Sequence, residues 1–463
     1  MASRITPAFG LAPCLSSKAY NKVLLNLPLE AGVSLNAVPQ ALPGCQLLNS
    51  AACWARGAAS RTNHQCSSRN SRHGFLFKAI IPVRNCCKIS IAVIDPGIPR
   101  PCSTFPNIPP ILSAAMKTRL FAIFIVCLAT SIAAAQTFTV GTATAGPGQK
   151  ALGTIEVPAG PDATASIPVA VFRGAKPGPV LALVSGSHGT EYASIIALEK
   201  LIQSLDPAQI SGTVIILPLV NIPSFEQKVP HVNPVDGKSM NRFYPGNPEG
   251  SQTERVAWQI TKQVVERCDY LIDYHGGDLD ENLRPYAYWP KSGDAKHDAS
   301  TRDMVLAFGL DHIIVWSDRP KDPNASRYLD NTANTRGKPA IAVEAGFSGT
   351  VRPQDVQLLV NGTFSVMRYL RMLPGAATPV EHPVWIDKID TVESAQPGIF
   401  YPLVERGTYV AQGMKIGYVT DYFGQIVFEA KAPTAGVVLY ICGVPSMKKG
   451  DTVANVGEIT TNP

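Results

Sequence analysis

Short apolar runs alternate with amphipathic segments through the middle of this 463-residue chain, and this alternation constrains its fold more than any other feature. Residues 180–184, 213–220 and 270–274 are predicted to be buried strands, because they are short and strongly apolar. The segments at 191–205 and 253–267 have the spacing of amphipathic helices. Strands that alternate with helices in this way favour an α/β layer structure with a largely parallel sheet.

The alternation continues to residue 344 and then gives way to a different pattern. A helix near 301–308 and strands at 312–316 and 340–344 extend the α/β part. Past about residue 379, short strands separated by Gly-containing turns indicate a small all-β module of the barrel-sandwich type. This module lacks the Met-Lys-Met setting of a swinging-arm lysine, which argues against a carrier role.

The net charge of +6 is unevenly distributed along the chain. Residues 1–115 carry 11 Lys and Arg against 2 Asp and Glu, whereas the rest carries 30 against 33. Because the part from residue 116 onward is mildly acidic and has no stripe of Lys and Arg, nucleic acid is not an expected partner. The cysteines are irregularly spaced, so neither a zinc ribbon nor a compact disulfide framework is predicted.

A targeting signal is expected well inside the chain. Residues 116–119 (Met-Lys-Thr-Arg) precede an apolar run that ends in small residues at Ala135. This is the order of a secretory signal peptide, and the run is shorter than a membrane span. We interpret 116–135 as a signal peptide of an exported, periplasmic or extracellular protein with no stable membrane span after cleavage. Residues 1–115 are interpreted as an unstructured leader or a misassigned start, with a transit peptide as the alternative.

Three candidate metal ligands follow two of the predicted strands. His188 and Glu191 lie in a Ser-His-Gly-Thr-Glu segment after the strand at 180–184, and His275 follows the strand at 270–274. Open α/β sheets bind ligands at the carboxyl ends of such strands. Two imidazoles and one carboxylate would leave a zinc ion one open position for chemistry, and we expect one Zn²⁺ per chain. Each residue alone has a structural explanation, as a loop cap, a helix-opening acid or a core histidine, but the joint pattern favours metal binding.

Glu344 ends the apolar strand predicted at 340–344. A carboxylate in that position is partly desolvated, which raises its pKa. Such a group can take a proton from water and later deliver it to a leaving amine. A Glu that caps the following turn is the structural alternative. We predict that Glu344 is the catalytic general base.

Two segments resemble one known family. Residues 178–191, together with Asp-Gly-Lys-Ser-Met-Asn-Arg-Phe-Tyr-Pro-Gly at 236–246, resemble the succinylglutamate desuccinylase/aspartoacylase family of zinc deacylases. The resemblance covers about residues 174–349 and extends to the C-terminal β module. It implies a zinc-carboxypeptidase-like mixed sheet flanked by helices, with a deacylase domain at 136–380 and the β module at 381–463.

The resemblance also implies roles for single residues. His188, Glu191 and His275 would be the zinc ligands, and Glu344 would be the catalytic Glu. Asn241 and Arg242 match the Asn-Arg pair that holds the substrate carboxylate in the family, a task that suits a guanidinium fork and an amide donor. Outside this context, an Asn and an Arg before Pro-Gly would be read as a surface turn.

One departure from the family pattern concerns the arginine that helps to polarise the scissile carbonyl. The family carries it between an Asn-x-Pro segment and the Asp-Gly of the Asn-Arg motif, but residues 221–236 contain no arginine. Lys228 or His231 are the candidates for this positive charge and for substrate binding, although neither reproduces the bidentate fork.

Together these features predict a zinc-dependent hydrolase that cleaves the amide bond of an N-acyl amino acid or a similar small-molecule carboxylate. A zinc carboxypeptidase or peptide amidase would use the same ligands and the same base. A non-catalytic periplasmic binding protein is the third alternative, if the β module were the functional half. The sequence does not specify the acyl group, and homo-oligomer formation stays open.

Overall fold

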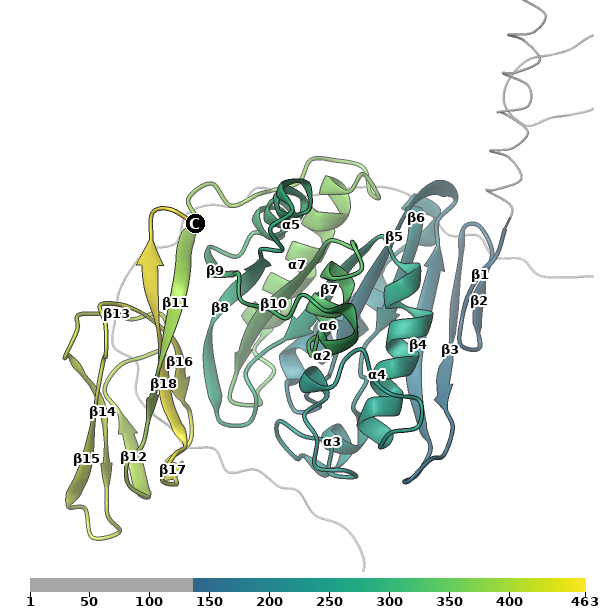
Figure 1. Cartoon of the computed structure of the whole chain (residues 1–463). Helices are drawn as coiled ribbons and strands as arrows, with labels where there is room; N and C mark the ends of the chain where they lie inside the picture. The colour runs from purple at the N-terminus through teal and green to yellow at the C-terminus, as the bar shows by residue number, and fades with distance from the viewer. Residues whose placement is uncertain (1–135) are drawn as a thin grey trace, which may run out of the picture. The chain divides into compact units, whose positions relative to one another are not determined.

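The structure is a computed structural model that describes residues 136–463 (Figure 1). The leader expected at 1–115 and the signal peptide expected at 116–135 lie outside the described residues. Among the residues from 136 onward, no helix is long and apolar enough to cross a membrane.

A mixed sheet of twelve strands forms the centre of the fold. Strand β5 (Lys176–Ser185) pairs in parallel with β6 (Ser211–Leu217) on one side and with β7 (Tyr270–His275) on the other. Strand β10 (Ala340–Phe347) pairs in parallel with β7. Since successive strands are added on opposite sides of β5, the carboxyl ends of β5 and β7 form the kind of crevice in which open α/β sheets bind ligands.

Antiparallel strands flank this parallel centre. The hairpin of β3 (Gln149–Val157) and β4 (Ala165–Arg173) extends the sheet beyond β6, where the sequence alternates as half-buried strands do. Strand β8 (Glu281–Pro290) lies between β10 and β9 (His312–Trp316), antiparallel to β10. The sequence did not predict β8, because Pro285 interrupts its pattern. That proline lies at a register shift between β8 and β10, which is where a sheet tolerates a residue without an N–H.

Helices cover both faces of the parallel strands (Figure 1). On one face, α2 (Tyr192–Ser204), α5 (Ala295–Phe308) and α7 (Pro353–Tyr369) bury a large apolar core with alternate residues of β5 and β7. On the other face, α4 (Gln252–Gln263) and α6 (Leu329–Asn334) cover the remaining residues of the same strands. The shorter elements are β1 (Phe138–Val140), β2 (Ala143–Ala145), α3 (Ile222–Gln227), η1 (Pro207–Gln209), η2 (Met240–Arg242), η3 (Val265–Arg267) and η4 (Pro323–Ala325).

The C-terminal residues form two β layers around an apolar core that also includes Leu283 of β8. Four strands belong to the twelve-stranded sheet: β11 (Val384–Glu393), β13 (Tyr409–Val410), β16 (Gly436–Cys442) and β18 (Thr452–Thr460). The other four form a second sheet: β12 (Gly398–Pro402), β14 (Lys415–Thr420), β15 (Ile426–Lys431) and β17 (Ser446–Met447). Because β11 pairs with β9 and β16 pairs with β8, main-chain hydrogen bonds continue from the α/β part into the C-terminal part.

A small apolar cluster also crosses this junction. Tyr286 and Ile314 from the α/β part pack with Ile386, Val437 and Leu439 from the C-terminal strands. The two parts therefore share side-chain packing as well as strand pairing.

We expect Leu439→Ala to lower the free energy of unfolding by about 2–5 kcal/mol, because this side chain is only 1% exposed within the shared cluster. Urea unfolding followed by circular dichroism should show a single transition, whose midpoint moves to a lower urea concentration. Leu403→Ala is the matched control, since Leu403 is 54% exposed on the same C-terminal part, and it should change the stability by less than about 0.5 kcal/mol. Two separate transitions would contradict a shared core.

Candidate metal centre and active site

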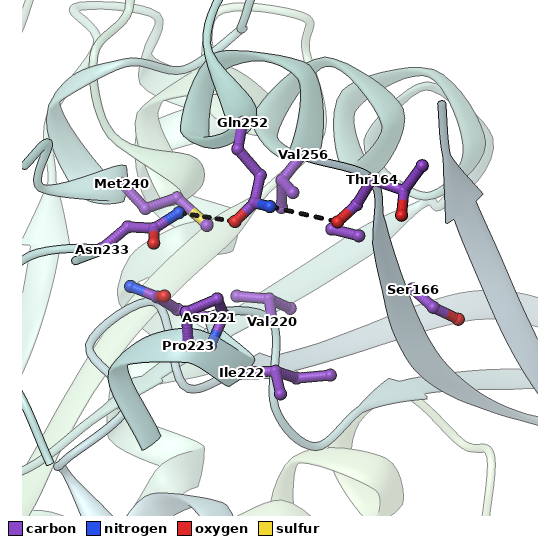
Figure 2. Close-up of a pocket in the computed structure, with 11 residues that line it drawn as sticks. Thr164, Ser166, Val220, Asn221, Ile222, Pro223, Asn233, Met240, Gln252 and Val256 are labelled. Atoms are coloured by element: carbon purple, nitrogen blue, oxygen red, sulfur yellow. Dashed lines mark hydrogen bonds between the residues drawn. The ribbon is translucent and has the colours of Figure 1, made fainter. Parts of the chain in front are cut away.

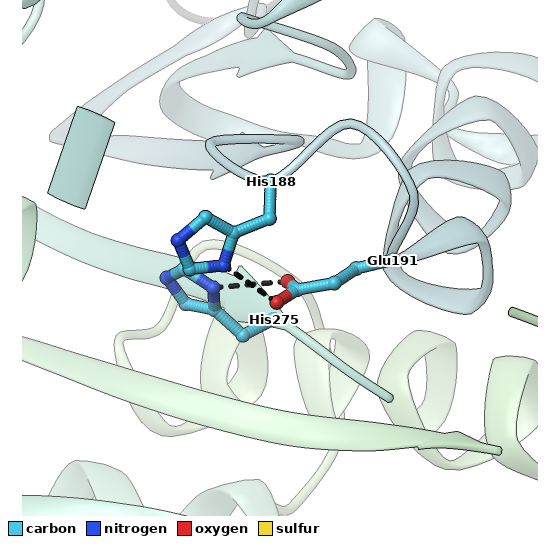
Figure 3. A group of neighbouring side chains, drawn as sticks. All are labelled: His188, Glu191 and His275. Atoms are coloured by element: carbon cyan, nitrogen blue, oxygen red, sulfur yellow. Dashed lines mark hydrogen bonds and ion pairs between the residues drawn. The ribbon is translucent and has the colours of Figure 1, made fainter. Parts of the chain in front are cut away.

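His188, Glu191 and His275 converge at the carboxyl ends of β5 and β7 (Figure 3). One ligand atom from each residue lies within 4.8 Å of the others. The Glu191 carboxylate lies between the rings, with Oε1 2.7 Å from Nδ1 of His188 and Oε2 3.0 Å from Nδ1 of His275. Oε2 also accepts a hydrogen bond from the backbone N–H of Gly276 at 3.1 Å. The structure thus brings together the three residues that the sequence singles out as metal ligands.

Backbone geometry explains how these loops come so close. Glu191 is the N-cap residue of α2, but its side chain makes no capping hydrogen bond and points to the two histidines instead. A Cβ on Gly276 would lie 2.1 Å from the carbonyl oxygen of Ala345, and a Cβ on Gly189 would lie 2.4 Å from the backbone nitrogen of Phe225. Only glycine fits at these two positions.

The far nitrogen of each histidine has its own partner. Nε2 of His188 lies 3.2 Å from the hydroxyl of Ser239, and Nε2 of His275 lies 3.3 Å from the buried carboxylate of Asp273. A carboxylate or hydroxyl at Nε2 fixes the ring orientation and leaves Nδ1 as the metal-binding atom. Asp273 was not predicted from the sequence, although it stands two residues before His275 and therefore shares its face of β7.

The electrostatics of the group also fit a cation. Burial alone would raise the pKa of Glu191, but His188 and His275 hold it below its usual value. Burial alone would lower the pKa of His275, yet Asp273 and Glu191 raise it well above the usual value. Two imidazole nitrogens and one carboxylate are a donor set that suits zinc, and a metal ion binding here would displace the proton of His275.

Glu344 faces the same region from the next strand. It is the register partner of His275 on β7 and of Tyr286 on β8, so its side chain is on the face of the sheet that carries His275. Burial raises its pKa well above the usual value; His275 opposes the increase, and Glu191 adds to it. The structure therefore places the predicted general base beside the candidate metal ligands, in a desolvated setting.

A second acid near this site has no counterpart in the sequence-based prediction. Burial raises the pKa of Glu281 to about 7, with a further contribution from Glu191. Its carboxylate accepts a hydrogen bond from the backbone of Asp278 at 3.1 Å. Glu281 begins β8, and because that strand was not expected, no sequence signal placed the residue here.

Asn241 and Arg242 lie on η2, and Asn241 is close to the candidate ligand His275. The Asn241 amide nitrogen is 3.1 Å from Nε2 of His275, and its amide oxygen accepts a hydrogen bond from the backbone N–H of Leu329 at 2.9 Å. Arg242 is exposed, and its guanidinium carbon lies 4.9 Å from the centre of the Tyr328 ring. A second, buried guanidinium, that of Arg319, lies 4.1 Å from the same ring. Arg242 is thus available to a substrate carboxylate, while the amide oxygen of Asn241 is already bound to the start of α6.

The two candidate cations of the segment 221–236 have different surroundings. Lys228 ends α3 in a left-handed backbone conformation, is exposed, and makes no side-chain hydrogen bond or ion pair with the described residues. The His231 ring centre lies 6.4 Å from that of His188. Its Nδ1 is 3.2 Å from the buried carboxylate of Asp278, and its Nε2 is 3.4 Å from Asp280. Mainly through Asp280, the pKa of His231 is raised to about 9, although the ring is partly shielded from solvent, which opposes the increase.

A cavity of about 270 Å³ lies next to these loops (Figure 2). Across it, the Gln252 side chain accepts a hydrogen bond from the Asn233 amide at 3.0 Å and donates one to the carbonyl oxygen of Thr164 at 3.1 Å. No charged side chain lines the cavity, and its wall includes Asn221 and Met240, which lie at the start of the segment 221–236 and directly before Asn241. It therefore borders the site without containing any of the residues predicted to act in it.

Comparison with known proteins agrees with this geometry. Residues 177–370 match the model of the succinylglutamate desuccinylase/aspartoacylase catalytic domain. The N-alpha-acetyl-L-2,4-diaminobutyric acid deacetylase of Halomonas elongata is 30% identical over 299 residues, which are 63% of this chain and 86% of that protein. The chain belongs to the succinylglutamate desuccinylase/aspartoacylase family.

Solved structures that are similar to this chain have the same mixed α/β fold. A succinylglutamate desuccinylase/aspartoacylase from Rhodobacter sphaeroides is 25% identical, with a TM-score of 0.60 over 68% of this chain and 96% of its own. A product-bound ectoine utilization protein from Ruegeria pomeroyi is 25% identical, with a TM-score of 0.61 over 66% of this chain and 95% of its own. The aligned portion of each structure covers nearly its whole length, so the fold similarity includes more than the catalytic domain.

We expect this protein to bind one divalent metal ion per chain, and we expect the His275→Ala variant not to bind it. Because the raised pKa of His275 favours its protonated form in the ion-free protein, we expect metal binding to release a proton. The apparent affinity should therefore rise about tenfold per pH unit as long as the ring stays protonated. Competition titrations with a chelator at several pH values would measure this. His382→Ala, which removes an exposed histidine outside the group, should bind metal as the unsubstituted protein does; equal loss in both variants would contradict the assignment.

Proposed function

We propose that this protein is a zinc-dependent deacylase that hydrolyses the amide bond of an N-acyl amino acid. The observation that carries the proposal is the pairing of a His188–Glu191–His275 group with a desolvated carboxylate, Glu344, on the neighbouring strand. The family supports hydrolysis of an acylated amino acid, and the donor set supports zinc. From the same ligand arrangement, we also propose that the fold is related to that of zinc carboxypeptidases.

Zinc bound by the three ligands would lower the pKa of a water molecule and polarise the acyl carbonyl. Glu344 would accept the proton of the attacking water, because its raised pKa makes it a stronger base than an ordinary carboxylate, and would then transfer that proton to the departing amine. Asp273 and Ser239 would hold the two imidazole rings in the orientation that presents Nδ1.

Arg242 would bind the carboxylate of the amino acid. Its guanidinium is exposed and lies over the Tyr328 ring, which leaves its planar fork open to a carboxylate. Asn241 would hold η2 in place, because its amide oxygen accepts a hydrogen bond from the backbone N–H of Leu329 at the start of α6.

Of the two candidate cations, His231 is favoured over Lys228 as the stabiliser of charge on the acyl oxygen. Its raised pKa keeps it protonated at neutral pH, and its ring lies beside that of His188. The contact of Nε2 with the half-exposed Asp280 is long, at 3.4 Å, so this N–H can be exchanged for a substrate oxygen while Nδ1 stays with the buried Asp278.

A panel of N-acyl amino acids would test the activity, beginning with Nα-acetyl-L-2,4-diaminobutyrate, the substrate in the name of the Halomonas relative. Glu344→Gln should lower kcat by about 10²- to 10⁴-fold and should leave the metal content unchanged. Since a general base must be deprotonated and burial raises its pKa, kcat/KM of the unsubstituted protein should fall with decreasing pH already above the usual Glu range.

Glu199→Gln on the exposed surface of α2 is the control for that experiment and should retain full activity. Release of C-terminal residues from peptides, with no cleavage of N-acyl amino acids, would replace the deacylase proposal with a carboxypeptidase. A protein that binds no metal and hydrolyses neither class would overturn the enzyme proposal in favour of a binding protein.

His231→Asn and Lys228→Met separate the two candidate cations. We expect His231→Asn to lower kcat by about 10²-fold, because one charge stabiliser of the transition state is lost, and Lys228→Met to have little effect. Activity of the unsubstituted protein should decrease as the pH rises through about 9, where the imidazolium loses its proton. Loss of activity in the Lys228 variant alone would reverse the assignment.

A further inference from the structure

Arg406 is a residue of the C-terminal part that reaches into the α/β part. It lies in the loop between β12 and β13, yet its Nη1 donates hydrogen bonds to the carbonyl oxygens of Leu283, at 2.5 Å, and Gly346, at 2.6 Å. Its Nη2 donates to the Asp355 carboxylate at 3.1 Å. The Arg406 side chain is only 16% exposed and that of Asp355 1%, so this charged group is largely enclosed and has an opposite charge to balance it.

The two carbonyl groups belong to one pair of residues in the sheet. Leu283 on β8 and Gly346 on β10 are register partners, directly after the shift that separates them from the pair Tyr286 and Glu344. Within that shift lies Pro285, which has no N–H to give to the ladder. Arg406 therefore donates hydrogen bonds directly beside the irregular point of the β8–β10 ladder.

This pair of residues is next to the groups proposed to act in catalysis. Glu344 is two residues before Gly346 on the same strand. A Cβ on Gly277 would lie 2.6 Å from the carbonyl carbon of Gly346, so the loop that follows His275 is packed directly against it. Any displacement of Gly346 would be transmitted to Glu344 through the strand and to that loop through direct contact.

We propose that Arg406 is a positioning residue for Glu344, through which the C-terminal part completes the active site. The guanidinium fixes the end of the β8–β10 pair, and the fixed pair sets the direction in which the Glu344 carboxylate faces the candidate metal ligands. This inference rests on the proposed function, in which Glu344 is the general base. It assigns the C-terminal strands a part in the chemistry without a contact to substrate.

The test compares Arg406→Met, Arg406→Ala and Arg406→Lys in the full chain, using the N-acyl amino acid that the unsubstituted protein hydrolyses. We expect Arg406→Met to lower kcat by about 10²-fold, the effect of a displaced catalytic group, with KM and metal content nearly unchanged. The acidic limb of its pH profile should shift, because the surroundings of the carboxylate change. Arg406→Lys should be intermediate, and added guanidinium ion should restore part of the activity of Arg406→Ala.

Arg352→Met is the matched control. Arg352 stacks on the same ring as Arg406, that of Phe347, but it makes no side-chain hydrogen bond to β8 or β10 within residues 136–463. Its replacement should leave kcat within about twofold of the unsubstituted protein, as expected for a substitution outside the proposed active site.

Hydrogen exchange gives a readout that does not need a substrate. Amide protons of residues 344–347 should exchange faster in Arg406→Met than in Arg352→Met, whether or not a substrate is known. Unchanged exchange together with unchanged kcat would overturn the positioning role, and so would a loss of kcat fully explained by lost metal. If the unsubstituted protein hydrolyses no substrate, the proposed function fails, and the exchange result still decides whether Arg406 holds this part of the sheet.

Discussion

The sharing of one buried carboxylate between two histidines is the interaction on which this structure depends. Glu191 is placed by the first turn of α2, and the rings it contacts come from a loop after β5 and from the end of β7. A lone carboxylate would be expensive to bury, so the site requires positive charge from both sides. The sheet topology meets this requirement by placing the carboxyl ends of β5 and β7 side by side.

Acidic groups outnumber basic ones around this point. Glu281 and Glu344 both have raised pKa values, to which Glu191 contributes in each case, and Asp273 lies behind His275 without a hydrogen bond of its own apart from that ion pair. Such a concentration of carboxylates in a desolvated site costs free energy unless a cation balances it. The arrangement is therefore better suited to a bound cation than to the side chains alone, which is an argument for metal binding independent of the family.

The sequence was sufficient where local patterns decide the structure. Apolar runs placed β5, β6 and β7, and the residues directly after two of them supplied the candidate ligands. The sequence was insufficient where contacts between distant segments decide the structure. Strand β8 contains prolines but is held by pairing with β10 on one side and β9 on the other. Glu281 could not be predicted as a site residue because it begins this unexpected strand. Arg406 is far in sequence from Leu283 and Gly346, whose carbonyl groups it contacts. The pairing of β11 with β9 is likewise a contact between distant segments that no local sequence pattern predicts.

The position of β18 has a consequence for how the protein is made. This strand is the last one among the described residues, and it lies between β11 and β16. Because β11 pairs with β9 and β16 pairs with β8, it is connected through them to the α/β part. During synthesis on the ribosome, the α/β part would emerge and begin to fold while the edge formed by β8 and β9 still lacked its cover. A chain interrupted shortly before residue 452 would lose an interior strand of the large sheet, and β11 and β16 would be left without the partner between them.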